Sequence, residues 1–320
     1  LILSARAKIE KEPNYSKVAA ALAANALYKE VFRESVDSDT FELQYRKAFV
    51  QNIKKLVKAE ILSAKLLDFD LKKISEAMQP ERDSLFKYLG LQILIDRYFT
   101  RHNNKIMETP QAFWMRVAMG LAINEENKEE RAIEFYNLFS NMLYTPSTPT
   151  LFNSGTTHSQ LSSCYLNTFD DSIDGIFEGV WQEARKSKYA GGLGFDVTNF
   201  RASGAYIKGT NGISGGLVPW LKILNDTLVA VNQGGKRPGA GCAYLEPWHL
   251  DFEDFLNLRR NTGDERLRCH DMNTASWVPD LFMEKVRADE DWYMFCPSDC
   301  RELHEAYGED FKESYDYYCQ

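Results

Sequence analysis

Residues 160–167 have the sequence Gln160-Leu161-Ser162-Ser163-Cys164-Tyr165-Leu166-Asn167 and lie where the character of the chain changes. This stretch places a thiol directly after two hydroxyls, at the start of an apolar run typical of a β-strand. Just before it, residues 144–160 are rich in Thr, Ser, Pro, Gly and Asn, a composition that indicates a loop between domains. The sequence therefore predicts a boundary here, with one domain over residues 1–158 and another over residues 159–320.

The chain before this boundary has the spacing of α-helices. Thr109-Pro110 predicts a helix start, because Thr is a good N-cap and proline is tolerated in the first turn. Apolar residues also recur every three or four positions, as they do on one face of a helix. An early example consists of Tyr15, Val18, Ala19, Leu22 and Ala26. We expect a helical N-terminal domain.

After the boundary, short apolar runs alternate with helical segments. The runs at 164–166, 194–197 and 242–245 are short enough for strands, whereas residues 174–188 and 217–231 have helical spacing. Strands that alternate with helices favour parallel pairing in an α/β sheet or barrel. The expected fold class of this half is therefore α/β.

Composition and charge exclude several classes of protein. The chain has 320 residues, of which 44% are hydrophobic and 26% are charged, as in an ordinary soluble globular protein. Its net charge of -8 argues against nucleic acid as the main partner. There is no apolar run of about 20 residues and no secretory pattern, so we expect a cytoplasmic protein without membrane contact. The six cysteines are scattered, which predicts no disulfide framework.

Two glycine-rich segments and one group of His, Cys and Asp residues are candidates for ligand sites. Gly191-Gly192-Leu193-Gly194 follows a helix, whereas a dinucleotide fingerprint follows a strand. Residues 233–239 lack the Gly-Lys-Ser/Thr ending of a phosphate loop. Each segment on its own predicts a turn. A metal site is not predicted either, because neither HExxH nor paired CxxC spacing occurs. The metal candidates closest in sequence are His249, Cys269, His270 and Asp271.

The cysteines taken singly point to packing. A lone cysteine such as Cys164 is most often a small buried hydrophobe, and the spacing of Cys296 and Cys300 around Pro297 favours the same interpretation for that pair. Only the residues around Cys164 change this interpretation.

In the order and spacing of several motifs, the chain resembles the large (alpha) subunit of class I ribonucleoside-diphosphate reductases. The resemblance runs from Thr109-Pro110-Gln111 to Asp299. Its motifs are residues 148–155, residues 160–167, Asp171-Ser172-Ile173-Asp174, residues 191–196, 201–209 and 233–239, and Glu246-Pro247-Trp248-His249.

The resemblance implies a helical N-terminal domain followed by part of a ten-stranded α/β barrel. It implies reduction of ribonucleoside diphosphates to 2'-deoxyribonucleotides, in which a thiyl radical removes the 3'-hydrogen, water leaves C2', and two thiols close to a disulfide. Cys164 matches one of these two thiols. Its partner must place its Cα roughly 4.4 to 6.8 Å away, and none of the other five cysteines stands at the position that the family uses.

The family's binding residues carry over to three groups of positions. The substrate-binding group is Thr148, Ser163, Cys164 and Gly192. The specificity-effector group is Asp171, Ser172, Ile173, Arg201 and Lys208. The specificity loop that connects the two sites carries Gln233 and Arg237. A structural role for Asp171, as N-cap of the helix that follows it, is compatible with effector binding.

The resemblance also implies partners. No cofactor or metal is bound directly by this chain; a radical-generating metallo-subunit, the small (beta) subunit, supplies the radical. Deoxynucleoside triphosphates or ATP act as allosteric effectors, thioredoxin or glutaredoxin is the reductant, and the large subunit forms a homodimer.

Some parts of the family pattern have no match in these 320 residues. They are the N-terminal ATP cone, the radical cysteine loop, the second reducing cysteine and the C-terminal thiol pair. We therefore expect this piece alone to be inactive. Two alternatives stay open: a cobalamin-dependent (class II) ribonucleotide reductase, and a catalytically inactive nucleotide-binding and dimerisation module.

Overall fold

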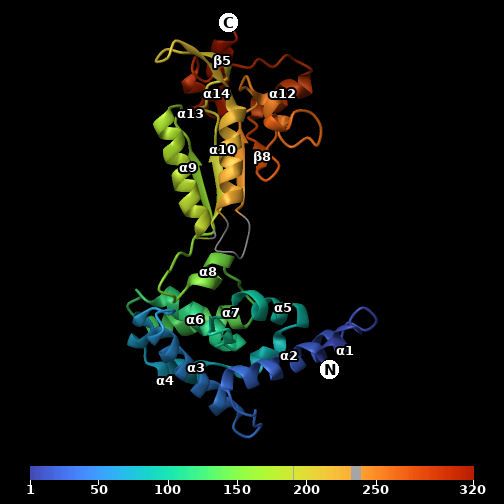
Figure 1. Ribbon diagram of the computed structural model, residues 1–320, viewed down its shortest axis with the longest axis vertical. Helices are drawn as coiled ribbons and strands as arrows, with labels where there is room; N and C mark the ends of the chain where they lie inside the picture. Colours follow the sequence, from blue (N-terminus) through green and yellow to red (C-terminus); the bar gives the residue numbers. More distant parts are fainter. Residues whose placement is uncertain (190, 232–238) are drawn as a thin grey trace. The chain divides into compact units, whose positions relative to one another are not determined.

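The computed structural model describes residues 1–189, 191–231 and 239–320 (Figure 1). The chain forms two compact units, Leu1–Ser162 and Ser163–Gln320. The sequence places the boundary between residues 158 and 159, within the loop that precedes the second unit.

The first unit is helical, with one short antiparallel hairpin, β1 (Arg101–His102) and β2 (Lys105–Ile106). Its α-helices are α1 (Ile2–Arg6), α2 (Tyr15–Phe32), α3 (Phe41–Lys58), α4 (Leu71–Ala77), α5 (Tyr88–Ile93), α6 (Pro110–Ala122), α7 (Lys128–Ser140) and α8 (Thr148–Asn153). Shorter helical turns are η1 (Ala64–Asp68), η2 (Pro80–Leu85) and η3 (Leu94–Tyr98). The helical N-terminal domain expected from the sequence is confirmed.

Helix α6 is the centre of the first unit. Thr109 is its N-cap and Pro110 its first residue, as the sequence predicts. The helix is apolar on every side, and a helix of that kind is stable only when it is surrounded by protein. Gly120 allows a close approach, because a Cβ there would lie 2.1 Å from the backbone nitrogen of Gly155.

The one cation inside α6 is fully paired. Arg116 is buried, and its Nε donates to Glu108 Oε1 at 2.7 Å. Its Nη1 donates to the carbonyl oxygens of Ser154 at 2.7 Å and Leu151 at 3.3 Å. A buried charge is tolerated when it is paired and hydrogen-bonded. This cluster therefore ties the C-terminal part of α8 to α6.

A second buried polar cluster centres on Asp83. Its carboxylate accepts hydrogen bonds from Tyr28 Oη at 2.8 Å, Tyr45 Oη at 2.9 Å and Gln111 Nε2 at 2.8 Å. Tyr136 Oη in turn donates to Gln111 Oε1 at 2.8 Å. Burial raises the pKa of Asp83 to about 6, although the hydrogen bonds from its neighbours oppose the rise.

The second unit is a mixed helix and strand structure. Its strands are β3 (Cys164–Thr168), β4 (Gly192–Asp196), β5 (Ser203–Ile207), β6 (Gly212–Gly215), β7 (Gly241–Leu245) and β8 (Asn273–Ser276). Its helices are α9 (Ile173–Lys188), α10 (Leu217–Ala230), α11 (Phe252–Leu256), η4 (Glu265–Leu267), α12 (Asp280–Ala288), α13 (Arg301–Glu305) and α14 (Gly308–Tyr318).

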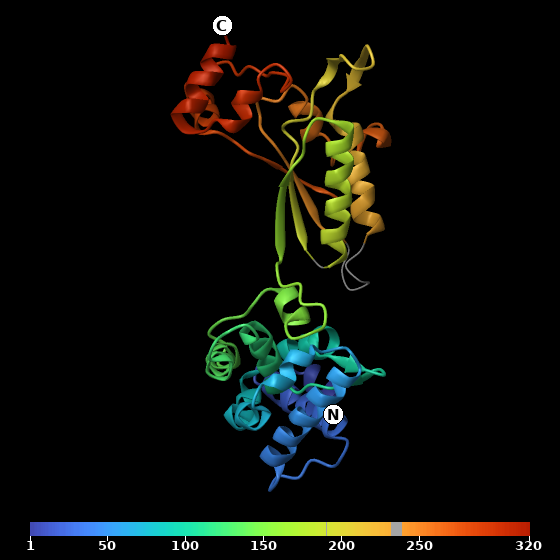
Figure 2. The same cartoon turned by 90° about the vertical axis from the view of Figure 1, so that its left-hand side faces the viewer.

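Four strands form one parallel sheet in the order β3-β4-β7-β8, and β5 and β6 form a separate antiparallel hairpin. Helices α9 and α10 cover one face of the sheet (Figure 2). Between them and the sheet lies a core that includes Phe169, Phe195 and Leu221. The predicted parallel α/β arrangement is confirmed.

The C-terminal helices have a core of their own. Helices α12, α13 and α14 enclose Trp248, Leu281, Leu303, Phe311 and Tyr315. The indole ring of Trp292 stacks on Tyr315, with ring centroids 4.3 Å apart.

Two interpretations from the sequence are wrong. Gly192 lies in strand β4, not in a turn, because parallel neighbours on both sides hold this strand, which begins two residues before the predicted run 194–197. In α2, Val18 and Ala26 are exposed, whereas Ala20, Ala23 and Leu27 are buried. That helix is rich in Ala and Leu on every side, so periodicity did not identify its buried face.

The Asp83 cluster predicts an unusual pH dependence. The pKa of Asp83 is higher in the folded chain than its ordinary 3.8, so between about pH 4 and pH 6 the folded state binds the proton more tightly. Stability should therefore fall as pH rises through this window, by up to about 3 kcal/mol. Asp83→Asn should remove this fall. Urea unfolding between pH 4 and pH 7, with exposed Asp68→Asn as control, measures it; identical profiles for wild type and Asp83→Asn would contradict the assignment.

Candidate functional site

The open face of the sheet carries every second residue of its strands. In β3 the exposed residues are Cys164, Leu166 and Thr168, whereas Tyr165 and Asn167 between them are less exposed. Successive side chains of a strand point to opposite faces, and α9 and α10 cover only one of them. The strand register then places Gly192 beside Cys164, and Gly194 beside both Leu166 and Cys242.

Cys164 is exposed at the start of β3, so it does not fill a core. The hydroxyl of Ser163 donates to its sulfur at 3.7 Å. The amide of Gly192, on the neighbouring strand, donates to the carbonyl oxygen of Ser163 at 2.6 Å. A Cβ at Gly192 would lie 3.9 Å from the sulfur, so glycine here leaves space beside the thiol.

Cys242 lies on the same face but out of reach of Cys164. The register separates the two residues by one intervening strand, and two strand spacings amount to about 9.5 Å. A disulfide needs Cα atoms no more than about 7 Å apart. The thiol pair that the resemblance implies therefore does not form between these two cysteines. Cys300 is buried, as the sequence predicts, and Cys296 is partly buried.

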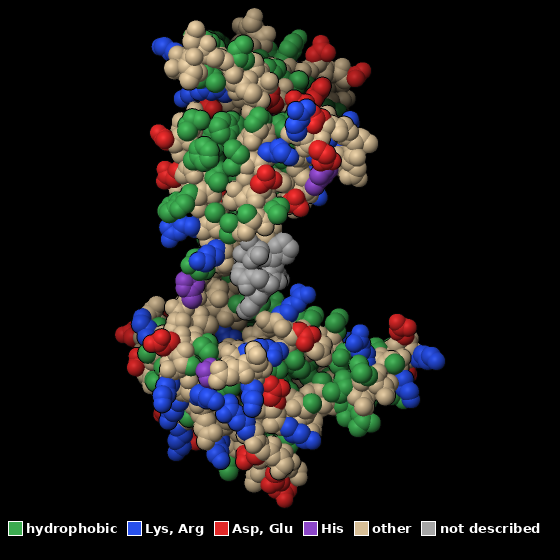
Figure 3. Space-filling model, in the orientation of Figure 1, with side chains coloured by type: hydrophobic (Ala, Val, Ile, Leu, Met, Phe, Trp, Pro, Cys, Tyr) green, Lys and Arg blue, Asp and Glu red, His purple; other side chains and the backbone are tan. Residues whose placement is uncertain are grey.

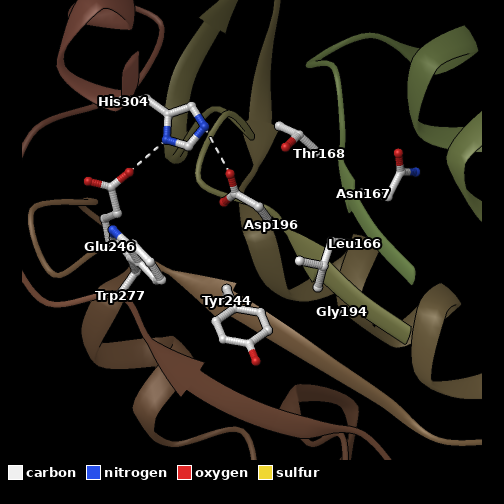
Figure 4. Close-up of a pocket in the computed structure, with 9 residues that line it drawn as sticks. All are labelled: Leu166, Asn167, Thr168, Gly194, Asp196, Tyr244, Glu246, Trp277 and His304. Carbon is white, nitrogen blue, oxygen red and sulfur yellow. Dashed lines mark hydrogen bonds and ion pairs between the residues drawn. The ribbon is translucent and has the colours of Figure 1, made fainter. Parts of the chain in front are cut away.

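A cavity of about 470 Å³ opens at the carboxyl ends of the strands (Figure 4). Polar groups at such strand ends converge because parallel strands all end at the same edge. Trp277, which follows β8, forms one wall and is 68% exposed. The other lining residues are Leu166, Asn167, Thr168, Gly194, Asp196, Tyr244, Glu246 and His304.

His304 of α13 lies between two carboxylates in this cavity. Its Nε2 is 2.8 Å from Asp196 Oδ2, and its Nδ1 is 2.6 Å from Glu246 Oε1. Figure 4 shows the imidazole ring between them. The hydrogen bonds to Asp196 and Glu246 raise the pKa of His304 to about 10, against the opposing effect of burial. The ring is therefore an imidazolium at neutral pH and joins α13 to the ends of β4 and β7.

No sequence motif identifies His304 as a residue of this cavity. Its partners lie far away in the sequence, and the surrounding residues 301–305 form no known motif. Because both ring nitrogens donate, neither has a lone pair for a metal ion. Within residues 1–189, 191–231 and 239–320, no group of three or more His, Cys, Asp or Glu is arranged to hold one.

The residues of the predicted effector group lie around the start of α9 and the β5–β6 hairpin. Asp171 Oδ2 accepts from Arg201 Nε at 2.8 Å, which joins two members of the group. Ser172, not Asp171, is the N-cap of α9, and its hydroxyl accepts from Gly175 N at 3.0 Å. The N-cap interpretation of Asp171 is therefore wrong, because its carboxylate is turned towards Arg201.

The remaining predicted residues are distributed as follows. Ile173 is the first residue of α9, and Lys208 is exposed just after β5. Thr148 belongs to the first unit, where it begins α8 and its hydroxyl lies 3.1 Å from Tyr98 Oη. Gln233 and Arg237 lie outside the described residues.

Comparison with known proteins agrees with this arrangement. Residues 162–320 match the ribonucleotide reductase barrel domain, and residues 84–159 match the ribonucleotide reductase all-alpha domain. The chain belongs to the ribonucleotide reductase large-subunit family. The expected order, a helical domain followed by part of an α/β barrel, is thereby confirmed.

Three relatives show how far the similarity extends. The chain is 54% identical to ribonucleoside-diphosphate reductase subunit alpha of Chlamydia trachomatis serovar D over 318 residues, 99% of this chain and 30% of that protein. It is 43% identical to the alpha subunit of Helicobacter pylori strain J99, over 98% of this chain and 39% of that protein. It is 41% identical to the large subunit of Vaccinia virus, over 96% of this chain and 40% of that protein. The chain thus spans less than half the length of these relatives.

Among the described residues, no helix combines the length and the apolar character needed to cross a membrane.

The two ion pairs of His304, with Asp196 and Glu246, form what is called the His304 bridge. Removing this bridge should lower the free energy of unfolding by an amount that depends on pH. Because the pKa of His304 is raised from 6.5 to about 10, the bridge contributes fully below pH 6.5 and is lost as pH rises through 10. His304→Gln should lower the free energy of unfolding by about 2 kcal/mol at pH 6, and much less at pH 10.5. Thermal and urea unfolding at both pH values measure this. The exposed His270→Gln is the control; equal losses at both pH values would argue against the charged bridge.

Proposed function

We propose that this chain is the all-alpha domain and part of the barrel of a class I ribonucleotide reductase large subunit, which reduces ribonucleoside diphosphates to 2'-deoxyribonucleotides. The observation that supports this most directly is the position of Cys164. Its thiol is exposed on the open face of the sheet, next to a hydroxyl and a glycine, and those are the residue types that match the family's substrate site.

The reaction needs two electrons from protein thiols. A thiyl radical outside these residues takes the 3'-hydrogen and later returns it, so it is not consumed. The 2'-hydroxyl leaves as water, and the hydrogen that replaces it derives from two thiols that become one disulfide. The balance is ribonucleotide plus two thiols giving deoxyribonucleotide, disulfide and water. Cys164 provides one thiol, and a dithiol protein such as thioredoxin or glutaredoxin then reduces the disulfide.

Neighbouring residues have roles consistent with this chemistry. Ser163 offers a hydroxyl to the substrate sugar, and it already contacts the sulfur. Gly192 lets the substrate approach the backbone without a side chain in the way. Thr148, at the start of α8, has its hydroxyl 3.1 Å from Tyr98 Oη, and its part in substrate binding stays a prediction of the resemblance.

Cys164→Ser should abolish turnover in the full-length enzyme with its radical-generating subunit. The substitution keeps the size of the side chain and Cys164 is exposed, so folding and substrate binding should change little. We expect deoxynucleotide formation with a thioredoxin system to fall by at least about 100-fold, because no disulfide can form. Product analysis by chromatography and substrate binding by calorimetry measure the two effects.

Cys242→Ser is the matched control, since Cys242 lies on the same face but outside disulfide distance of Cys164. It should leave turnover unchanged. Normal thioredoxin-dependent turnover in Cys164→Ser would overturn the proposed role. Turnover with adenosylcobalamin and no second subunit would instead favour the class II alternative.

The proposal includes a specificity-effector site formed by Asp171, Ser172, Ile173, Arg201 and Lys208. A carboxylate and a hydroxyl suit the sugar or base of a nucleoside triphosphate, and two cations suit its phosphates. Support comes from the contact of Asp171 with Arg201, just before the β5–β6 hairpin. Lys208, in the loop of that hairpin, is exposed. The effectors would be deoxynucleoside triphosphates or ATP.

A homodimer would cover the exposed face of α9 and α10. Ile173, Phe177 and Trp181 recur every four residues along α9 and are 60%, 49% and 57% exposed. Figure 3 shows hydrophobic side chains gathered over this region of the second unit. A row of exposed, large apolar side chains along one helix is typical of a protein interface.

Trp181→Glu should weaken dimer formation. An exposed residue is changed, so the monomer should fold normally, but a buried charge at the interface should raise the dimer dissociation constant at least about tenfold. Analytical ultracentrifugation measures this. Glu178→Gln, which changes charge on the same helix outside this apolar row, is the control. An unchanged dissociation constant for Trp181→Glu would place the interface elsewhere.

A further inference from the structure

Residues 200–203 lead into the β5–β6 hairpin and are held one by one by other segments. Arg201 N and Nε donate to Asp171, at 3.3 and 2.8 Å. The amide of Ala202 donates to the sulfur of Cys296 at 3.4 Å. This segment is not in the four-stranded sheet, so its backbone amides have no neighbouring strand to bond to. The side chains of Asp171 and Cys296 accept their hydrogen bonds instead.

His249 holds the first residue of the segment. The ring is fully buried, and its Nδ1 accepts from the amide of Asp251 at 3.0 Å. The proton of the neutral ring must then be on Nε2, which donates to the carbonyl oxygen of Phe200 at 2.7 Å. Burial lowers the pKa of His249, although the hydrogen bond to Phe200 opposes this. The neutral ring thereby fixes the residue just before Arg201.

Asp251 holds both ends of the hairpin. Its Oδ1 and Oδ2 accept from the amide of Ser203, the first residue of β5, at 3.0 and 3.1 Å. Its Oδ2 also accepts from the amide of Leu217, the first residue of α10, at 2.9 Å. The carboxylate is buried, so both contacts are shielded from water. A single side chain therefore joins the start of β5 to the start of α10, two residues after the end of β6.

The packing at this point leaves no space. Gly216, between β6 and α10, has φ of +74°, and a Cβ there would lie 2.4 Å from Asp251 Oδ2 and 2.8 Å from Ser203 N. The hairpin itself is exposed, with Tyr206 at 62% and Ile213 at 74%. An isolated two-stranded hairpin is marginally stable, so its orientation depends on what holds its ends.

We propose that Asp251 and His249 are positioning residues for the phosphate-binding cations of the effector site. This inference rests on the proposed function, because it takes Arg201 and Lys208 as those cations. His249 sets the backbone beside Arg201, and Asp251 sets the hairpin that carries Lys208. Neither positioning residue touches the effector. Their effect on binding should therefore depend on the phosphates of the ligand and not on its base.

The contacts of Asp251 with Ser203 and Leu217, which hold the two ends of the hairpin, are called the clamp. Hydrogen exchange tests whether this clamp exists, without any ligand. In the wild-type protein, the amides of Ser203 and Leu217 should exchange as slowly as those of β4. In Asp251→Asn, an NH2 group replaces one of the two acceptor oxygens. The amide of Ser203 bonds to both oxygens, so it loses an acceptor in either orientation of the new side chain and should exchange at least about tenfold faster. Fast exchange of both amides in the wild type would overturn the clamp, even if the variant did not fold.

Ligand binding tests the consequence. Binding of dTTP and of thymidine is measured by competition for wild type, Asp251→Asn and Asp254→Asn. Asp254→Asn is the control, because Asp254 is exposed in α11, the helix that Asp251 precedes. This substitution should leave the binding of both ligands unchanged. We expect Asp251→Asn to weaken dTTP about tenfold and thymidine less than about twofold. Equal weakening of both ligands, or of neither, would overturn the positioning role.

The two readouts separate this inference from the proposed function. If wild-type protein bound no dTTP while Ser203 and Leu217 remained protected, the effector site would be wrong and the clamp would be purely structural. If dTTP bound with normal affinity to an Asp251→Asn protein whose hairpin exchanged fast, the effector site would stand and the positioning role would be wrong.

Discussion

The second unit depends on one constraint, the parallel pairing of β3, β4, β7 and β8 with helices on a single face. Pairing in this order places the alternate residues of every strand in rows across the sheet. One set of rows packs against α9 and α10 and provides the core. The other set is therefore free to carry Cys164, Asp196 and Tyr244, and the position of each follows from its place in the strand rather than from its own interactions.

Beyond the carboxyl ends of the strands the chain is irregular, and side chains take over the role of the hydrogen-bond ladder. His304 joins α13 to two strands, Asp171 holds Arg201, and Asp251 holds both ends of a hairpin. Buried charged groups of this kind are stable only when each is satisfied. The polar residues at this edge thus shape the loops, and the loops in turn place the residues proposed to bind nucleotides.

Local signals in the sequence were sufficient for much of the fold. Thr109-Pro110 gives the start of α6, and the helix that follows Ser172 begins one residue before the predicted segment. The His304 bridge could not be predicted, because its energy comes from Asp196 and Glu246, which meet it only after the sheet has formed. The direction of the Asp171 side chain was missed for the same reason: a carboxylate beside a helix start caps it unless a distant cation such as Arg201 competes.

The two glycines of β4 show how a residue that disfavours strands becomes useful in one. Glycine weakens a strand because it loses more backbone freedom on folding, but β4 has a parallel partner on each side to compensate. At Gly194, a Cβ would come within 2.7 Å of Leu166 Cδ2 and 3.3 Å of the Tyr244 ring. Glycine there lets both neighbouring side chains lie across the strand. Gly192, beside Cys164, keeps the backbone open next to the thiol. The open face is thus shaped as much by the side chains that β4 lacks as by those its neighbours carry.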